Sequence, residues 1–438
     1  MSAPGSADRY HALDSLRGFA MFLGVLLHAA LSFLQEPPPF WSVRDSAPTP
    51  LADAFVIAVH DFRMQLFFLL AGFFGCLLYQ RYGLGGLLRH RLLRVAVPFA
   101  LAVLLIVPTV QAVGLYVEIE NVRAESVRGV PSPLRAYAAG LVAANPSAST
   151  TQLVADFFLS GASYARVPLV HLWFLYYLLV FVAVVAIAAP LLGRLAGTRV
   201  LARFDAGFRC VIEGRGRVLV PVLVTFPFLL PMRWIVETPM SWYPQVHIVG
   251  YYLLFFAFGW VLYRHRDLVP AFGRGWKVNL AVANVLVLPV MVWAIVAGAT
   301  AERAGADVLG YKLGAHALEA LYTWLMIVGL WGAFLHYFAR ERAWVRYLAD
   351  SAYWCYLASL TPILVFQFAV KDWAAPGLLK CALVTGVTML VLLASYEWLV
   401  RYTFVGAVLN GRKVRPARTG TQAPERLLIV RQQPLPAE

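Results

Sequence analysis

Residues 12–34 read ALDSLRGFAMFLGVLLHAALSFL and decide the class of fold. A helix needs about 20 mostly apolar residues to cross roughly 30 Å of hydrocarbon, and this stretch has that length. Polar residues 1–10 precede it, and the apolar run is too long for a signal peptide and has no small-residue cleavage site. We therefore expect the stretch to remain in the mature protein as a transmembrane helix.

The composition extends this conclusion to the whole chain. Hydrophobic residues make up 61% of the 438 positions and charged residues 14%, which is about half the share expected of a soluble globular protein. Further apolar runs follow the first, and they predict an all-α, polytopic bundle of about ten transmembrane helices. The predicted spans are 12–34, 51–79, 93–115, 171–193, 217–232, 246–264, 278–299, 313–338, 347–370 and 376–402.

The charged loops predict the orientation of the chain in the membrane. Cytoplasmic loops carry an excess of Lys and Arg, and most of the 37 such residues fall on one side if both termini are cytoplasmic. We therefore attribute the net charge of +14 to basic loops that set the orientation of the chain in the membrane. The basic residues stand in short clusters between apolar runs, whereas nucleic-acid binding would favour one basic soluble face.

We expect one transmembrane domain over residues 1–410, followed by a tail. Residues 411–438 are basic and contain proline but no long apolar run, which is typical of a disordered cytoplasmic tail. The longest outside loop, about 116–170, includes an apolar stretch at 153–159, and we expect it to cover the outer mouth of the bundle. No internal repeat is visible, so nothing in the sequence favours an inverted-repeat transporter.

The cysteines form no metal-binding or disulfide pattern. They are far apart, and three of the four lie in apolar stretches, where Cys is commonly a small core residue. We expect no metal site and interpret all four as buried or inert thiols: Cys76, Cys210, Cys355 and Cys381.

Charged and imidazole groups inside the predicted spans indicate where a functional site could lie, because such groups are costly in hydrocarbon. In the first span, Arg17 and His28 are eleven residues apart, so on an ideal helix their directions differ by only about 20°. They share one face and are separated by about 16 Å along the axis. The plainer alternative is an Arg17 that anchors the cytoplasmic end and a His28 packed in the interior.

Two further spans carry polar groups. The second, HDFRMQLFFLLAGFF from His60 onward, places His60 and Arg63 on one face. In the alternative interpretation these groups serve packing alone: Asp61 and Arg63 form an ion pair with each other or with another helix, and His60 forms a hydrogen bond with Asp61 or a backbone carbonyl. The fourth, HLWFLYYLLVF, places His171 and Trp173 at its outer end, where Trp173 alone would suggest an aromatic belt.

An arginine cluster follows the second span. Arg91 and Arg94 are three residues apart, and planar guanidinium forks suit phosphate oxygens, although such clusters also anchor anionic lipid. The predicted topology puts this pair on the cytoplasmic side and puts five histidines toward the outer ends of their spans, namely His28, His60, His171, His247 and His316. This polarity suits an anionic donor from the cytoplasm and an acceptor from outside, with a histidine as the base.

Together these segments resemble the membrane-bound acyltransferase family 3, and within it the branch of glucan succinyltransferases. LDSLRGFAMFLGVLLH is similar to the first-span pattern, in which ten residues separate an Arg from a His. RHRLLRVAVPF contains the R-x-x-R element, while FRMQLFFLLAGFF and HLWFLYYLL are similar to the signatures of the second and fourth spans. The resemblance covers about 10–412, and the specific motifs lie before 180.

The resemblance implies a membrane O-acyltransferase of the bacterial inner membrane. Such an enzyme moves an acyl group, succinyl or acetyl, from cytoplasmic acyl-coenzyme A to a hydroxyl of an extracytoplasmic glucan or other cell-envelope carbohydrate. It implies a catalytic His28 supported by Arg17, coenzyme A phosphates held by Arg91 and Arg94, and no permanently bound cofactor. We further expect a polar channel from this arginine pair toward His28, with four substrate-site candidates near its upper end: His60, Arg63, His171 and Trp173.

Some alternatives stay open at this point. Ser359 stands where the ninth-span motif of such proteins often ends in a His, so the role of this span in the chemistry is undecided. A carrier or flippase for a lipid-linked or acyl-containing substrate would also need polar groups within spans, but it would favour internal repeats and paired broken helices. A scaffold for a polysaccharide synthase would tolerate His28→Ala. The acyl group, the acceptor and the oligomeric state are undetermined.

Overall fold

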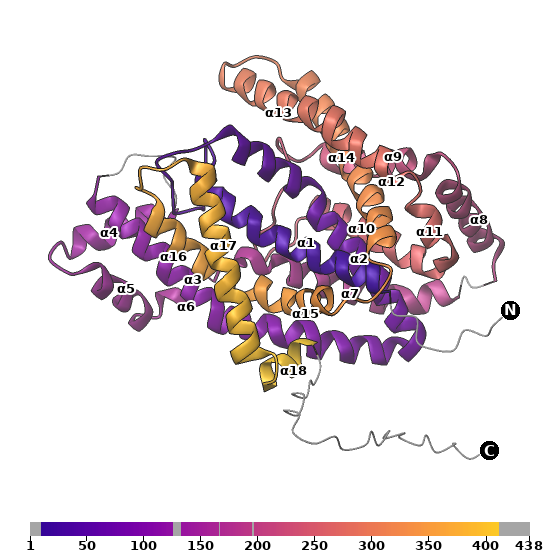
Figure 1. The fold of residues 1–438 in the computed structure, drawn as a ribbon, viewed down its shortest axis with the longest axis horizontal. Coiled ribbons are helices and arrows are strands. Elements are labelled where there is room, and N and C mark those ends of the chain that lie inside the picture. The colour runs from indigo at the N-terminus through magenta and orange to yellow at the C-terminus, as the bar shows by residue number, and fades with distance from the viewer. Residues whose placement is uncertain (1–9, 126–132, 166, 195–196, 411–438) are drawn as a thin grey trace.

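The computed structural model describes residues 10–125, 133–165, 167–194 and 197–410. Within these ranges the chain is helical and contains no strand, as expected (Figure 1). The predicted tail at 411–438 lies outside the described residues.

The first three long helices correspond to the first three predicted spans. They are α1 (His11–Ala30), α2 (Pro50–Arg91) and α3 (Val97–Arg123), and a π-helical turn at Leu92–Ala96 joins α2 to α3. Within α2 the backbone leaves the helical conformation at Gly83, where φ is 66°. Glycine adopts this left-handed region without the steric penalty of a Cβ atom, so the chain turns here before it reaches the arginine cluster.

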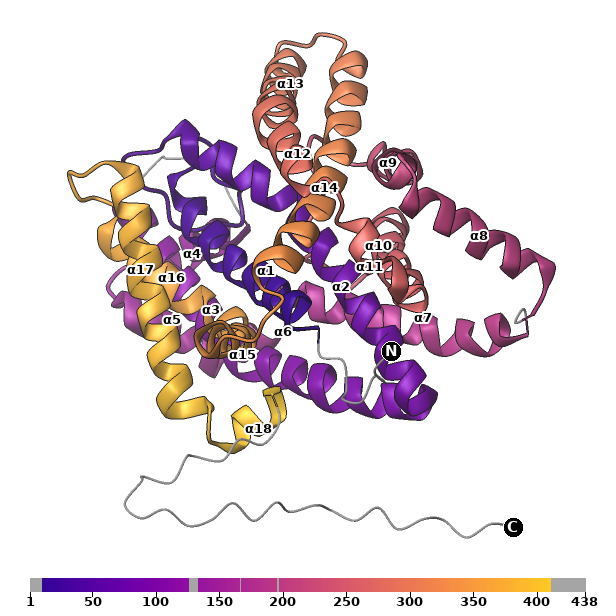
Figure 2. The ribbon, with the colours of Figure 1, turned by 45° about the vertical axis from the view of Figure 1, so that its right-hand side comes forward.

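The other helices follow in chain order. They are α4 (Pro133–Ala144), α5 (Thr150–Leu159), α6 (Ala162–Ala165), α7 (Trp173–Gly193), α8 (Arg199–Glu213), α9 (Gly216–Leu229), α10 (Val246–Arg264), α11 (Val269–Phe272), α12 (Trp276–Ala281), α13 (Leu288–Arg303), α14 (Leu309–Tyr337), α15 (Ala343–Ala358), α16 (Leu360–Val370), α17 (Gly377–Ser395) and α18 (Phe404–Asn410). Figure 2 shows α13 and α14 extending as a hairpin beyond the rest of the bundle, and α8 on its periphery.

Seven helical segments among the described residues are long and apolar enough to cross a membrane, or eight if one bent pair counts as a span. One segment, Pro50–Arg123, is 74 residues long and holds two of the predicted spans. The bent pair is α15 with α16, at 68°, and α9 has only 14 residues. The chain is a multi-pass helical protein, while the count of ten and the cytoplasmic termini stay predictions.

Two details of the loops differ in part from expectation. The apolar stretch at 153–159 forms most of α5, which packs with α4 against the C-terminal half of α3 through Leu115, Leu153 and Phe157. Of the four cysteines expected to be buried or inert, Cys76 and Cys355 are buried, whereas Cys210 is exposed on α8, so for Cys210 only the inert alternative remains a prediction.

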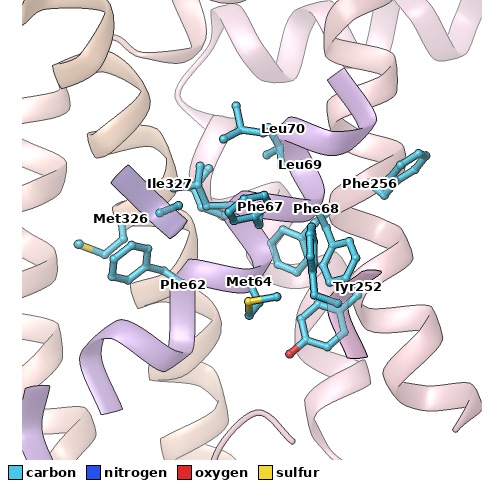
Figure 3. Packing of buried hydrophobic residues seen from close by; sticks show 14 of the residues in the cluster. Phe62, Met64, Phe67, Phe68, Leu69, Leu70, Tyr252, Phe256, Met326 and Ile327 are labelled. Atoms are coloured by element: carbon cyan, nitrogen blue, oxygen red, sulfur yellow. The ribbon is translucent and has the colours of Figure 1, made fainter. Parts of the chain in front are cut away.

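The main hydrophobic core lies where α2 meets α10 and α14. Figure 3 shows Phe68 of α2 beside Tyr252 of α10, with ring centres 5.0 Å apart, and Phe67 in the same cluster of buried residues. A Cβ atom at Gly72 would lie 1.9 Å from the Phe256 carbonyl oxygen, and one at Gly259 would lie 1.8 Å from that of Leu69. Small residues therefore let the two backbones touch, as is common where membrane helices pack. This contact fixes α2, which carries several of the candidate site residues.

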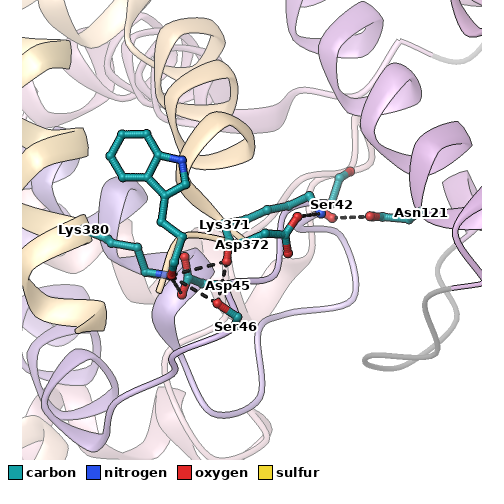
Figure 4. Close-up of polar contacts among 8 residues, drawn as sticks. Ser42, Asp45, Ser46, Asn121, Lys371, Asp372 and Lys380 are labelled. Atoms are coloured by element: carbon teal, nitrogen blue, oxygen red, sulfur yellow. Dashed lines mark hydrogen bonds and ion pairs between the residues drawn. The ribbon is translucent and has the colours of Figure 1, made fainter. Parts of the chain in front are cut away.

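A buried ion pair fastens the loop between α1 and α2 to α17 (Figure 4). Lys380 Nζ lies 2.6 Å from Asp45 Oδ1, and each side chain is only 1% exposed. Nζ also donates to the carbonyl oxygens of Trp373 at 3.1 Å and Lys371 at 3.3 Å. Because the lysine has several acceptors, its charge is well compensated despite burial.

We expect Lys380→Met to destabilise the protein strongly. The substitution leaves Asp45 buried without its cation, and breaking one side of a buried pair costs about 3–5 kcal/mol. Thermal unfolding of the purified protein in detergent measures the effect. Lys380→Met with Asp45→Leu should recover much of the loss, and a single variant as stable as the original chain would contradict this account.

Candidate active site

A single cavity brings together all four substrate-site candidates and His28. It has a volume of about 810 Å³, which is typical of small-molecule sites. Its lining includes His28 from α1, His60 and Arg63 from α2, His171 from the 3-10 turn Val170–Leu172, and Trp173 from α7. Sequence segments more than a hundred residues apart therefore meet at one site.

His28 lies in this cavity between two aromatic rings. Its imidazole is stacked on Trp41, with ring centres 6.1 Å apart and planes 13° apart. The ring of His171 meets it edge-on at 6.5 Å. No described residue forms a hydrogen bond with His28 Nδ1. The arrangement differs from a closely packed interior histidine, because the ring is held by stacking and borders open space.

Gln367 holds both His28 and the ring that stacks on it. Its amide Nε2 donates to the carbonyl oxygens of His28 and Ala29, each at 3.0 Å, and its Oε1 accepts from Trp41 Nε1 at 3.1 Å. The Trp41 indole also donates to Ser32 at 3.1 Å. One buried amide thus joins the last turn of α1, the α1–α2 loop and α16.

Sequence reasoning missed both Gln367 and Trp41. Gln367 had a usable signal, because it is a single polar residue in the apolar stretch LTPILVFQFAV, where polar groups usually have a partner. Trp41 lies in a loop after three prolines, and no helical spacing relates it to His28.

Gln367→Leu is expected to lower kcat of the acyl transfer proposed below by roughly ten- to a hundred-fold, since small misplacements of reacting groups have effects of this size. The KM for the donor should change little, because Gln367 positions His28 rather than contacting the donor. Steady-state kinetics on purified protein separate the two constants. Thr361→Val is the matched control. Thr361 lies on α16, as Gln367 does, and the substitution removes the hydrogen bond between the Thr361 hydroxyl and the hydroxyl of Thr109 on α3. Equal losses in both variants would indicate a general effect on α16.

The polar residues of α2 are not paired with one another. Asp61 and Arg63 form no ion pair with each other, so that part of the alternative is wrong. His60 Nε2 donates to the carbonyl oxygen of Val236 at 2.7 Å, as the backbone-carbonyl alternative allowed. Asp61 is fully buried on the other side of α2, where its carbonyl oxygen accepts from Thr323.

The residues at the start of α7 are buried rather than interfacial. Trp173 is 4% exposed and contacts Phe68 and Tyr252, so the aromatic-belt interpretation is wrong. His171 Nε2 donates to the carbonyl oxygen of Leu357 at 3.0 Å. The preceding residue, Val170, has a φ of 46°, a region that β-branched residues rarely adopt. Such strain costs of order 1–3 kcal/mol and is concentrated at functional sites.

The two remaining histidines of the outer group are not in the lining of this cavity. His316 is fully buried, and its Nδ1 lies 2.8 Å from Glu319. His247 lies 3.8 Å from Glu237. The sequence pattern therefore grouped five histidines, of which the structure brings three into one cavity.

The arginine candidates Arg17, Arg91 and Arg94 are not among the described lining residues of this cavity. Arg17 pairs with Asp14 at 3.1 Å and lies over the ring of Phe74. Arg91 Nη2 donates weakly to the Ala71 carbonyl oxygen at 3.4 Å. Within the described residues, the cavity lining includes neither of these arginines nor Arg94, so the channel from the arginine pair toward His28 stays a prediction.

Two tyrosines of α15 occupy the region between the cavity and the arginine pair. Tyr356 donates its hydroxyl hydrogen to the His171 carbonyl oxygen, with 2.6 Å between the two oxygens. One turn earlier, Tyr353 donates to the Arg94 carbonyl oxygen at 3.1 Å. We refer to Tyr353 and Tyr356 as the tyrosine layer.

A family match identifies the class of protein to which the chain belongs. Residues 10–397 match the model of the family described as an acyltransferase domain, and the chain is a member of that family. No solved structure matches the chain.

Among curated proteins, the chain is similar to glucans biosynthesis protein C. The proteins of that name from Escherichia coli strain SMS-3-5 / SECEC and from Escherichia coli O1:K1 / APEC are each 34% identical to it over 100 residues. The matched segment is 23% of this chain and 25% of each relative, so it spans about a quarter of the length of these proteins.

Proposed function

We propose that the protein is a membrane O-acyltransferase that moves an acyl group from cytoplasmic acyl-coenzyme A to a hydroxyl of an extracytoplasmic glucan or other cell-envelope carbohydrate. The observation that carries the proposal is His28 in a cavity of about 810 Å³ together with His60, Arg63 and His171. Membership of the acyltransferase family supports the reaction class. The acyl group is succinyl or acetyl.

His28 acts as the general base in this proposal. Its ring takes the proton of the acceptor hydroxyl while the hydroxyl oxygen attacks the thioester carbonyl carbon. The tetrahedral intermediate then collapses, the carbon–sulfur bond breaks, and the imidazolium returns the proton to the departing thiolate. The products are an ester and free coenzyme A, with no net change in protons.

The mouth of the cavity suits a carbohydrate acceptor. Phe40, at 53% exposure, offers a ring face for a sugar, and Asp53 and Arg233 offer hydrogen-bonding groups on the same rim. Sugars present both an apolar ring face and many hydroxyls, and pockets for such ligands combine aromatic walls with a few polar groups. The donor, in contrast, is held by Arg91 and Arg94 at its phosphates.

Mass spectrometry of the cell-envelope glycans, with and without the protein, tests the proposal. We expect an acyl ester to disappear from one glycan when the gene is deleted and to return with the intact gene but not with His28→Ala. An unchanged set of glycan esters would overturn the proposal.

The rival carrier function has its own test. Purified protein in vesicles with acyl-coenzyme A and acceptor should form the ester. Movement of an acylated or lipid-linked substrate without any new ester would favour the carrier.

A further inference from the structure

We propose that Arg63 is a further catalytic residue, whose guanidinium stabilises the oxyanion that forms on the thioester carbonyl beside His28. This inference rests on the acyltransferase function proposed above. It concerns a residue for which the sequence indicated only a place in the substrate site.

A glycine on α1 makes room for the Arg63 guanidinium. A Cβ atom at Gly24 would lie 1.9 Å from Arg63 Nη1 and 3.2 Å from Cζ, so the guanidinium occupies the space of that missing side chain. Gly24 is four residues before His28, which places the two on one helix face about 6 Å apart along the axis. The cation is thus seated directly beside the proposed base and lines the same cavity.

No described residue neutralises this cation. Arg63 is 8% exposed, it forms no ion pair or hydrogen bond within the described part of the chain, and its Nε is buried without a partner. The ionisable side chains near it include the phenols of Tyr356 and Tyr252, and no carboxylate pairs with it among the described residues. A buried, unpaired charge is costly and is usually retained where a ligand or reaction supplies the opposite charge.

The proposed reaction supplies that charge at one step. When the acceptor oxygen bonds to the thioester carbon, the carbonyl π electrons move onto the carbonyl oxygen, which becomes an oxyanion. The Nη–H groups of Arg63 donate to this oxygen, and they lose that interaction partner when the C=O bond re-forms and the thiolate leaves. The ground-state carbonyl is a weaker acceptor, so the interaction lowers the barrier selectively.

Another anion could use the same cation, namely a carboxylate on the far end of the acyl chain. The two possibilities make different demands on the donor. An oxyanion forms with every thioester, whereas a distal carboxylate is present only in a dicarboxylic acyl group. Comparison of acetyl-coenzyme A with succinyl-coenzyme A therefore distinguishes them.

The test measures kcat and KM for Arg63→Gln and Arg63→Lys in purified protein. We expect kcat to fall about 10²–10³-fold for Arg63→Gln with each donor that the original chain accepts, because removing one oxyanion donor has this effect. The KM values should change much less. Arg63→Lys should retain a higher kcat than Arg63→Gln but a lower one than the original chain. In a third variant, Arg63→Ala, added guanidinium ions should restore part of the activity.

Gly24→Ala provides a second variant that keeps every ionisable group. The new methyl group must displace the guanidinium, so kcat should fall as it does in Arg63→Gln while the protein stays folded. Gly386→Ala on α17 is the matched control, since no atom lies within 4 Å of the position of its Cβ. It should leave kcat unchanged.

The outcomes separate this inference from the proposed function. If the original chain forms no ester, the proposed function fails. If it forms ester and Arg63→Gln retains full kcat, only the role of Arg63 is overturned. A loss confined to succinyl-coenzyme A would likewise overturn the oxyanion role and assign Arg63 to a distal carboxylate.

Discussion

His28→Ala is expected to lower acyl transfer by about 10²–10⁴-fold, the usual contribution of a positioned general base. The loss should appear in kcat, because without the imidazole no group takes the acceptor proton during attack. The folded protein should persist, since the ring borders the cavity and its Nδ1 has no described hydrogen-bond partner to lose. Ester formation by purified protein in nanodiscs, together with the thermal unfolding midpoint, measures both.

His336→Ala is the matched control for this substitution. That imidazole lies near the end of α14 and packs against Trp276, outside the cavity lining. It should retain full activity. A His28→Ala protein that is fully active, or one that has lost its thermal transition along with its activity, would rule out the role assigned to the base.

The second large effect is expected at the arginine pair. Arg91→Ala and Arg94→Ala should each weaken binding of acyl-coenzyme A at least about tenfold, because hydrogen bonds to charged groups contribute about 1.5–3 kcal/mol. Arg91 keeps donors available for a phosphate, since its one described hydrogen bond, to the Ala71 carbonyl oxygen, is long at 3.4 Å. Calorimetry with coenzyme A measures the dissociation constant directly.

Two further variants sharpen that prediction. Arg91→Lys and Arg94→Lys should also weaken binding, since an ammonium group cannot reproduce a planar two-donor fork. Arg89→Ala is the control, because Arg89 is exposed in the same turn and carries the same charge. Donor affinity that is unchanged in the Arg91 and Arg94 variants, or reduced equally in the Arg89 variant, would refute a specific phosphate site.

Much of the fold could be predicted because hydrocarbon imposes a simple rule on sequence. Every backbone polar group must be satisfied within the segment, so long apolar runs form helices. The bend between α15 and α16 was missed, although its cause is visible in the sequence. Pro362 lacks an N–H group, and its ring clashes with the carbonyl group of Ala358, which breaks the expected span at Ser359.

The candidate site was predictable only where helical spacing applies. The spacing of Arg17 and His28 on one helix predicts that they share a face. The candidates at the start of α7 and on α2 could be selected because polar groups are costly in hydrocarbon. The contact of Arg63 with Gly24 depends on how α1 and α2 pack, which no local pattern encodes. The same holds for Trp41, whose place over His28 depends on the loop fastened by Asp45 and Lys380.

The tyrosine layer has an electrical consequence. A membrane that stores a voltage cannot contain an open water column, because each elementary charge that leaks across 100 mV dissipates about 2.3 kcal/mol. Tyr356 and Tyr353 bind the backbone at His171 and Arg94, and the described lining of the cavity does not include Arg91. We therefore expect this conformation to block the flow of ions through the bundle, because the two phenols fasten α15 to the segments that carry His171 and Arg94.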